Sequence, residues 1–420
     1  MTSSVSAIRS ATRRRFAVAL ATASVVACNT RPAAAVPAAT AATATAHQAA
    51  PPTVSHPAAP AAPVTTAQAG DSVHDAPPPG IVRGLYVNRF AAESPRKMRN
   101  LIALADSTEI NAFVIDIKDE FGINYASSDT LVRRNAGRGG TIANLPALLD
   151  TLHAHHILAI ARIVTFKDSV TARQNPAWVI RKSDGTPWHD KKGITWVNPY
   201  NRNVWEYNLR VAEEAARMGF GEVQFDYIRF PEPYKSLPEQ VFPGAGDVAK
   251  PVVLAEFLKT ARERLAKYNV KTTADIFGLV TSTPGALEVG QRWEDLAQST
   301  DVLLPMVYPS HYPHGSFGFD HPNAEPYGIV TAAIASAYKR DAKLGLAGER
   351  VRPWLQAFTL GAPAYGPDQI RAQKKAVYDA GYDGWVLWSP GSKYDAIASG
   401  LDRHAVSHKK TPTGAVAYAR

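Results

Sequence analysis

Short apolar runs alternate with longer amphipathic stretches between Ile81 and Leu401. The eight runs are IVRGLYV (81–87), NAFVIDIK (111–118), ILAIARIV (157–164), GEVQFDYI (221–228), VKTTADIF (270–277), DVLLPMVY (301–308), RPWLQAF (352–358) and DGWVLWS (383–389). Runs of this length are typical of buried strands, and their alternation with helices is typical of a parallel sheet. Eight such units predict an α/β fold with a single (β/α)₈ TIM barrel at 81–405.

Signals for the start and end of helices fall between these runs. We expect helices to begin at Ser94-Pro95, at Asn144, at Pro251 and at Gly366-Pro367-Asp368, and Gly219 to end a helix that begins near Asn203. An open, doubly wound sheet is the alternative. It should carry a glycine-rich phosphate turn after its first strand, and the segment LYVNRFAAESP (85–95) has none. The pattern therefore favours the barrel.

The first 27 residues are typical of an export signal. Four arginines precede the apolar run FAVALATASVVA (16–27), which is too short to span a bilayer. Cys28 follows this run and is the only cysteine in the chain. The segment 25–28 (VVAC) resembles the lipobox of bacterial lipoproteins, in which the cysteine is lipidated. We therefore expect an exported lipoprotein that is anchored to the membrane through Cys28 and faces the periplasm or the cell exterior. A cleaved signal peptide that leaves a soluble secreted protein is the alternative.

Two further segments outside the barrel are predicted to be disordered. Residues 28–80 are a linker composed mainly of Ala, Pro and Thr, which cannot bury enough apolar surface to fold. Residues 406–420 are expected to form a disordered polar tail. The net charge of the chain is +9, but residues 1–80 contribute +3 and residues 403–420 contribute +4, which leaves +2 for 81–402. This charge does not support a nucleic-acid-binding face on the barrel.

Charged and polar side chains gather late in the predicted strands, where the active site of such a barrel lies. These residues are Asp116, Lys118, Arg162, Asp226, Asp275, Tyr308, Gln356 and Trp388. Alternation along a strand places Gln224 and Asp226 on one face, toward the barrel mouth, while Val223 faces the helices. The same count places Lys118 on the face of Asp116. The polar set should converge on one bowl, although each carboxylate taken alone could equally belong to a buried charge network.

Six segments carry a resemblance to a known family. They are GLYVNRF (84–90), NAFVIDIKDEFG (111–122), ARIVTFKD (161–168), FDYIRFP (225–231), ADIFG (274–278) and LPMVYPSHY (304–312). Together they resemble the bacterial putative glycoside hydrolase domain family over essentially 81–400. The resemblance implies a TIM-barrel glycosidase, distantly similar to the α-amylase and α-galactosidase superfamilies. In such enzymes an Asp at the end of the fourth strand is the nucleophile, which corresponds to Asp226 here. Asp275, at the end of the fifth strand, is the candidate acid/base.

Glycoside hydrolysis requires two carboxyl groups that flank the bond, one ionised and one protonated. Because Asp226 and Asp275 end adjacent strands, we predict a retaining enzyme with a carboxyl separation of roughly 5–5.5 Å, whereas roughly 6.5–9.5 Å would indicate inversion. Arg162 and Arg229 are expected to keep Asp226 ionised.

The other polar and aromatic residues are assigned to the substrate. Asp116 and Lys118 are expected to bind sugar hydroxyls or to support the transition state. Further substrate-binding candidates are Arg162, Arg229 and Gln356. Aromatic rings pack on the apolar faces of sugars, and the candidate platforms are Trp188, Trp196, Tyr308, Tyr312 and Trp388. Each of these rings alone could instead pack the barrel or its loops. No cofactor is expected, and carbohydrate is the expected partner.

Two other classes of function stay open. The segments HAHH (153–156) and HYPHGSFGFDH (311–321) suggest a metal-dependent hydrolase such as a glycan deacetylase, although the first lies before the third strand and hence at the wrong end of the barrel. A non-catalytic glycan-binding envelope protein could have kept the barrel and lost turnover. The chain has neither a Walker loop nor a G-x-S-x-G motif, so a nucleotide-dependent enzyme and a serine hydrolase are not favoured.

Overall fold

The computed structural model describes residues 80–135, 137 and 142–411. The predicted signal peptide at 1–27, Cys28 and the linker up to residue 79 lie outside the described residues. Within the described part of the chain, no helix is both long and apolar enough to cross a membrane.

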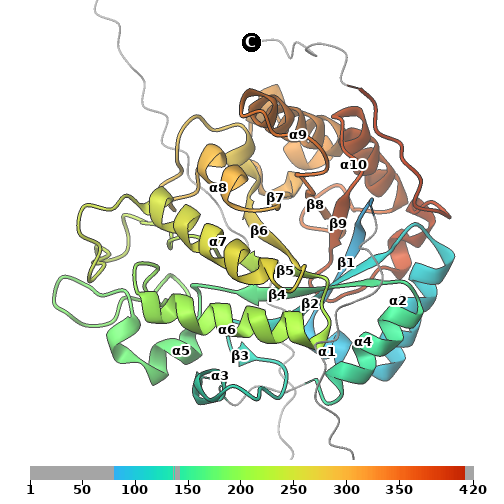
Figure 1. Ribbon diagram of the computed structural model, residues 1–420. Coiled ribbons are helices and arrows are strands. Elements are labelled where there is room, and N and C mark those ends of the chain that lie inside the picture. The colour runs from blue at the N-terminus through green and yellow to red at the C-terminus, as the bar shows by residue number, and fades with distance from the viewer. Residues whose placement is uncertain (1–79, 136, 138–141, 412–420) are drawn as a thin grey trace, which may run out of the picture. The chain divides into compact units, whose positions relative to one another are not determined.

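Eight parallel strands form a closed barrel (Figure 1). Each strand pairs with the next, and β1 pairs with both β2 and β9, which closes the sheet. The eight strands are β1 (Arg83–Val87), β2 (Ala112–Asp119), β4 (Leu158–Val164), β5 (Glu222–Asp226), β6 (Lys271–Phe277), β7 (Val302–Val307), β8 (Trp354–Gln356) and β9 (Trp385–Trp388). Each falls within one of the eight apolar runs or extends it by a single residue, so the prediction of a (β/α)₈ barrel is confirmed. A short strand, β3 (Gly122–Ile123), turns back antiparallel on the end of β2.

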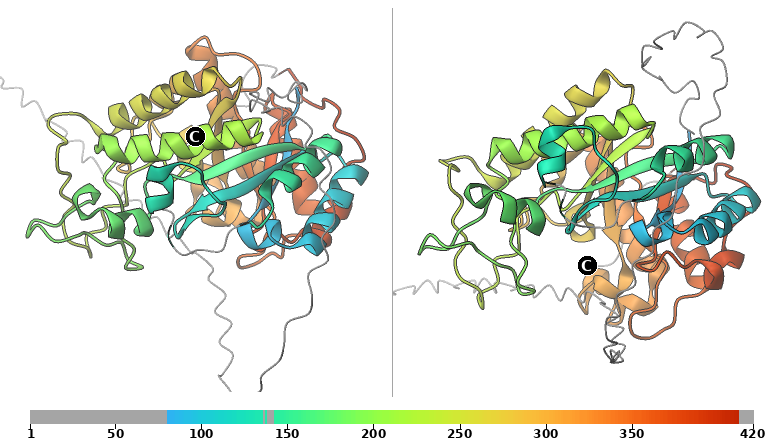
Figure 2. Two further views of the ribbon diagram at one scale, coloured as in Figure 1. Left: turned by 60° about the horizontal axis from the view of Figure 1, so that its bottom comes forward. Right: turned by 90° about the horizontal axis from the view of Figure 1, so that it is seen from below.

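Helices surround the barrel (Figures 1 and 2). The longer ones are α2 (Pro95–Ser107), α4 (Leu145–Ala154), α6 (Arg202–Met218), α7 (Lys250–Ala266), α8 (Trp293–Ser299), α9 (Pro326–Lys343) and α10 (Pro367–Asp379). The shorter ones are α1 (Arg89–Ala92), α3 (Thr130–Asn135) and α5 (Ser169–Gln174). Short 3₁₀ helices occupy Pro176–Trp178, Gly278–Thr281, Pro309–His311, Ser316–Gly318, Pro322–Ala324 and, as η6, Asp395–Gly400.

The predicted helix boundaries are confirmed. The side chains of Ser94 and Asn144 accept hydrogen bonds from the backbone at the starts of α2 and α4. Gly219 ends α6 with φ 113°, a left-handed conformation that favours glycine. These caps satisfy backbone groups that would otherwise lack partners at the helix ends.

The two faces of each strand lie in different environments. Side chains such as Val223 and Phe225 point outward into an apolar layer beneath the helices, as alternation predicts. The inner face of the barrel carries a separate apolar cluster that includes Val114, Ile160 and Leu304. Polar side chains occur at both ends of the strands: Glu222 at the start of β5 pairs with Arg352 at 2.6 Å, and the candidate residues lie toward the C-terminal ends. The barrel therefore has a packed interior, and its C-terminal end carries the candidate residues.

An irregularity in β2 overturns one prediction. Asp116 pairs with Arg162 of β4, but Lys118 pairs with Ile163, so Ile117 is an extra residue in the ladder. A bulge of this kind shifts the alternation by one position. Lys118 consequently leaves the face of Asp116, and its ammonium group contacts Asp168 at 2.8 Å and lies 5.4 Å from the ring of Tyr207 in α6. The prediction that Lys118 faces the bowl beside Asp116 was wrong.

The predicted disordered tail of 406–420 was wrong in its first part. The carbonyl oxygen of Val406 accepts a hydrogen bond from Arg83 at 2.7 Å. The backbone N–H groups of His408 and Lys409 donate to Asp383 at 2.7 and 3.0 Å. Residues 406–410 are therefore attached to the N-terminal end of the barrel, while 412–420 lie outside the described residues.

This attachment surrounds a buried charge cluster. Glu109 accepts from Arg83 at 2.5 Å, from the side chain of Lys374, and from the backbone of Asp402 at 2.9 Å. The side chain of Glu109 is fully buried, and those of Arg83 and Lys374 are at most 3% exposed. One carboxylate thus contacts two buried cations.

We predict that Glu109→Gln lowers the free energy of unfolding by about 3–5 kcal/mol, because it removes the buried charge that these two cations share. Urea denaturation of the protein measures this loss. Asp402→Asn is the matched control. Its side chain also pairs with Lys374 but is 50% exposed, so its loss should be under about 1 kcal/mol. Equal losses in the two variants would contradict this interpretation.

Candidate active site

Arg162 lies at the centre of the polar end of the barrel. It comes from β4, and its guanidinium contacts carboxylates from three other strands. Nη1 donates to Asp116 of β2, Nη2 donates to Asp226 of β5, and Nε lies 3.7 Å from Oδ2 of Asp275 of β6. All four side chains are less than 10% exposed. Four strands therefore bring three carboxylates and one cation to a single point.

Asp226 is held at the end of β5 by two N–H donors. Its Oδ2 accepts from Arg162, and its Oδ1 accepts from the backbone N–H of Tyr227 at 2.5 Å. Tyr227 has φ 50°, which is unusual for a residue with a side chain. Strained conformations of this kind gather at functional sites, because the surrounding structure must be built to hold them. The strand thus ends in a sharp turn whose backbone dipole points at the carboxylate.

Asp275 lies deeper and is 2% exposed. Nε2 of Gln224 donates to both of its oxygens at 2.8 and 3.0 Å, and the indole N–H of Trp354 donates to Oδ1 at 2.6 Å. Burial and the neighbouring charge of Asp226 raise the pKa of Asp275 well above its usual value, despite the opposing effects of Arg162 and these donors. Burial therefore disfavours the ionised form of Asp275 relative to an exposed carboxyl group.

The environment of Asp116 combines burial with hydrogen bonds from two side chains. Burial raises its pKa to about 6, although the hydrogen bonds from Arg162 and from the hydroxyl of Tyr86 lower it. Burial thus raises the pKa of two of the carboxyl groups around this guanidinium, Asp275 and Asp116. Raised carboxyl pKa values of this kind are what a site needs for a carboxyl group that acts as an acid.

Aromatic rings line one side of this cluster. Trp388 stacks on Tyr86 with ring centroids 3.9 Å apart, and Trp354 meets Trp388 edge-on at 5.4 Å. The guanidinium of Arg162 lies 5.3 Å from the ring centre of Trp388. Tyr308 is also buried at this end of β7, and burial, followed by the charges of Asp275 and Asp226, raises its pKa. The structure thus brings the predicted residues Tyr308 and Trp388 to the same site.

Arg229 and Trp196 lie next to this cluster but have other partners. Arg229 forms its ion pair with Glu232 at 3.2 Å, and the arginine that pairs with Asp226 is Arg162. Its guanidinium also lies 5.0 Å from the ring of Trp196. Trp196 is 1% exposed and meets the ring of Tyr227 edge-on at 5.7 Å. It therefore supports Tyr227 and offers no open platform.

Gln356 and two of the predicted aromatic platforms are buried elsewhere. Gln356 accepts from the backbone of Ser310 at 3.1 Å and donates to the carbonyl oxygen of Phe358 at 3.0 Å, which fixes the loops after β7 and β8. Trp188 is fully buried, and Tyr312 is 7% exposed. The contacts of Gln356 and the burial of Trp188 and Tyr312 indicate structural roles for the three side chains.

The sequence predicted no role for Tyr86 or Trp354. For Gln224 it predicted only the face of the strand on which the side chain lies. Each occupies an inward position of its strand and donates a hydrogen bond to one of the carboxylates. Alternation had placed Gln224 on the face of Asp226, which is confirmed. The same counting in the first and seventh runs would have placed Tyr86 and Trp354 inside the barrel.

The histidine segments do not form a metal-binding group. Within the described residues, no three His, Cys, Asp or Glu side chains gather in a way that could hold a metal ion. His155 lies beside Asp106 on the outside of the barrel, and His311 contacts Ser310. His314 is exposed near Asp320, with 3.7 Å between the nearest atoms.

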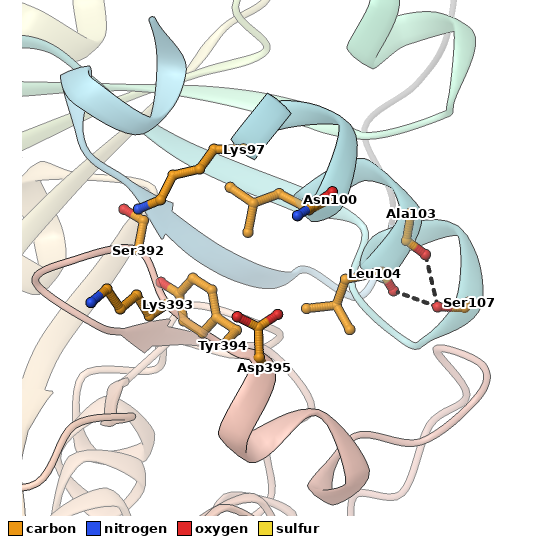
Figure 3. Close-up of a pocket in the computed structure, with 10 residues that line it drawn as sticks. Lys97, Asn100, Ala103, Leu104, Ser107, Ser392, Lys393, Tyr394 and Asp395 are labelled. Carbon is orange, nitrogen blue, oxygen red and sulfur yellow. Dashed lines mark hydrogen bonds between the residues drawn. The ribbon is translucent and has the colours of Figure 1, made fainter. Parts of the chain in front are cut away.

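A pocket of about 360 Å³ lies away from this cluster, between α2 and the segment that follows β9 (Figure 3). Lys97 and Leu104 of α2 line one side, and Lys393, Tyr394 and Asp395 line the other. After β9, the last strand of the barrel, the chain forms the short helix η6 beside this pocket. This helix lies in the layer of the surrounding helices. The hydroxyl of Tyr394 donates to the backbone oxygen of Tyr86 at 2.8 Å, so the pocket floor packs against β1.

Comparison with known proteins identifies a family and a fold. A family model described as "Putative glycosyl hydrolase domain" matches residues 84–394. A hypothetical protein from Ruminiclostridium thermocellum ATCC 27405 is 37% identical, with the match covering 46% of this chain and 96% of that one at a TM-score of 0.42. The glycoside hydrolase domain of PgaB (BpsB) from Bordetella bronchiseptica is 15% identical, covering 77% and 99% at a TM-score of 0.56.

The α-galactosidase TtGalA from Thermus thermophilus is 14% identical, with the match covering 75% of this chain and 59% of that one at a TM-score of 0.45. A search of curated protein sequences found no match. At 15% identity, the likeness to the PgaB domain shows that the two chains share the barrel fold.

The raised pKa of Asp116 predicts a pH dependence of stability. The folded protein retains this proton up to about pH 6, whereas the unfolded chain releases it near 3.8, so the free energy of unfolding falls as the pH rises between these values. A shift of this size corresponds to about 3 kcal/mol. We therefore expect Asp116→Asn to reduce this fall.

Denaturant melts of the wild type and of Asp116→Asn at half-unit steps between pH 4 and 7 measure the difference. Asp275 contributes to the slope in both proteins, so only the difference between them reports on Asp116. Parallel pH curves would contradict the assignment.

Proposed function

The chain belongs to the Putative glycosyl hydrolase domain family, which confirms the resemblance seen in its sequence, and from this membership we propose that it hydrolyses O-glycosidic bonds in a polysaccharide or oligosaccharide. The observation that carries the proposal is the pairing of Asp226 with Asp275 on Arg162. One carboxylate accepts from a guanidinium and a backbone N–H, and the other is buried and has a raised pKa. Glycosidases require such a pair.

Asp226 is the proposed nucleophile, and Asp275 is the proposed acid. Asp275 transfers its proton to the leaving oxygen as the glycosidic C–O bond breaks, and Asp226 forms an ester to the anomeric carbon. The ionised Asp275 then takes a proton from water, whose oxygen attacks the anomeric carbon and releases Asp226. The sugar keeps its configuration. The carboxyl separation of roughly 5–5.5 Å that this mechanism requires stays a prediction.

Other residues of the cluster have supporting roles in the proposal. Arg162 holds Asp226 and Asp116 in fixed positions relative to each other. Trp388 stacks on the buried ring of Tyr86 and is itself only partly buried, so a sugar ring can pack on Trp388 beside the carboxylates. Asp116 can accept hydrogen bonds from sugar hydroxyls when it is ionised.

We also propose that the protein is exported and anchored through a lipid on Cys28. The support is the sequence alone, with four arginines, a short apolar run and a cysteine in order. Such an anchor would place the barrel in contact with glycans of the cell envelope.

The two-carboxylate mechanism predicts different losses for three amide substitutions. Turnover should be measured with the wild type, Asp226→Asn, Asp275→Asn and Asp116→Asn on a screen of cell-envelope and exopolysaccharide glycans. We expect Asp226→Asn and Asp275→Asn each to lower kcat by about 10²–10⁴ or more, because each removes a group that reacts in the transition state. Asp116→Asn should lose less.

Each alternative has its own outcome in this screen. Equal turnover by the wild type, Asp226→Asn and Asp275→Asn would rule out the mechanism. A large loss in Asp116→Asn with little loss in Asp275→Asn would transfer the acid role to Asp116. If the protein binds a glycan without cleaving it, and Asp226→Asn binds that glycan equally well, the non-catalytic glycan-binding protein would be favoured. Activity that a chelator abolishes would favour a metal-dependent deacetylase.

The hydrogen bond from Trp354 to Asp275 gives a prediction for the pH profile. This bond stabilises the ionised form and lowers the pKa of Asp275. Trp354→Phe keeps an aromatic ring and removes the donor, so the pKa of Asp275 should rise. If Asp275 is the acid, the basic limb of the kcat/KM profile then moves to higher pH. Trp293→Phe is the control, since its N–H donates to the remote Asp341 at 2.9 Å. An unshifted limb in Trp354→Phe would contradict the role of Asp275.

A further inference from the structure

Two large apolar side chains are exposed at the same end of the barrel as the carboxylates. Phe90 follows the end of β1 and is 65% exposed, and Phe121 lies in the turn between β2 and β3 and is 53% exposed. Both follow the C-terminal ends of strands that contribute to the site through Tyr86 and Asp116. Rings left in water contribute little to folding, and exposed apolar surface beside a functional site is typical of binding.

Both rings are carried by backbone that is firmly held. The side chain of Asn88 accepts from Ala91 at 2.9 Å and donates to the carbonyl oxygen of Pro390 at 2.8 Å, which fixes α1 to the loop after β9. The N–H of Phe121 donates to the side chain of Asp119 at 2.8 Å. Gly122 completes this turn with φ 115°, which favours glycine. A ligand on these rings would therefore require little ordering of the backbone.

An ion pair links the two backbone segments that carry these rings. The guanidinium of Arg89 lies 4.7 Å from the centre of the Phe90 ring and 3.5 Å from Asp119, the residue that holds Phe121. The side chains of Arg89 and Asp119 are 17% and 12% exposed. We refer to Arg89, Phe90, Asp119 and Phe121 as the rim patch. It combines exposed apolar rings with polar groups that retain some access to water.

The rim patch is connected to the carboxylate cluster through Asn124. The amide of Asn124 donates to Asp119 at 3.3 Å and to the backbone oxygen of Asp116 at 3.0 Å. The strand that supports Phe121 is thus the strand that places Asp116 on Arg162. A chain of sugars bound over the carboxylates and leaving toward β1 and β2 would pass across the rim patch.

We propose that the rim patch is a sugar-binding subsite for an extended glycan, outside the position of bond cleavage. Sugar rings have apolar faces that pack on aromatic rings and hydroxyl edges that bond to charged groups, and the rim patch offers both. A second copy of this chain fits less well, because the rings are separated by charged groups. This inference rests on the proposed function and sharpens it: the substrate is a polymer, and its sugars bind beyond Asp226.

Affinity electrophoresis tests the proposal with named probes. The full chain is run in native gels that contain glycol chitin, chitosan, soluble starch, xylan or galactomannan. The variants are Phe90→Ala/Phe121→Ala, Phe90→Tyr/Phe121→Tyr, Asp226→Asn and Val406→Ala. Val406 is the matched control, since it is also 53% exposed but lies at the opposite end of the barrel beside Arg83.

We expect at least one polysaccharide to slow the wild type, Asp226→Asn, Val406→Ala and the double Tyr variant alike. The double Ala variant should bind that polymer at least about tenfold more weakly, since each ring contributes a stacking surface. Equal binding by the double Ala variant would overturn the proposal, as would a wild type that none of the five polymers slows. Thermal melts confirm that the double Ala variant is folded.

Two further results separate the subsite from the cleavage mechanism and from a dimer interface. If Asp226→Asn cleaves the bound polymer as fast as the wild type, the proposed mechanism fails while the subsite stands. If sedimentation shows a dimer that the double Ala variant dissociates, a second copy covers the rim patch and the subsite proposal is overturned.

Discussion

The contact of Arg162 with three buried carboxylates is the constraint on which the site depends. Each carboxylate alone would be costly at this depth, since burial removes the water that stabilises its charge. One guanidinium cannot neutralise three negative charges. Burial raises the pKa of both Asp275 and Asp116 above the usual range of a carboxyl group. The proposed division of roles between Asp226 and Asp275 depends on this effect.

The barrel makes this contact possible because its strands are parallel and in register. Arg162 lies beside Asp116 on one neighbouring strand and beside Gln224 on the other. Gln224 in turn donates to Asp275 on the next strand. The polar residues of successive strands thus reach one another directly across the barrel mouth. The left-handed turn at Tyr227 adds a backbone donor where β5 ends.

The fold and the centre of the site could be predicted from the sequence, because both depend on local patterns. Eight apolar runs located the strands, and alternation placed Gln224 and Asp226 on the inner face. The position of Lys118 could not be predicted, since the bulge at Ile117 arises from how β2 and β4 pair. Arg229 pairs with Glu232 and not with Asp226, a difference that only side-chain directions decide. The attachment of 406–410 likewise depends on distant partners. Arg83 is more than 300 residues away in sequence, and Asp383 is about 25 residues away.

The central claim is that Asp226 is the carboxylate that reacts with the anomeric carbon. Covalent trapping tests it most directly. The protein is treated with a panel of cyclitol epoxides that match different sugars, and the labelled peptide is located by mass spectrometry. The mechanism predicts a single label on Asp226 that Asp226→Asn abolishes. A label on Asp275 or Asp116, with Asp226 unmodified, would contradict it.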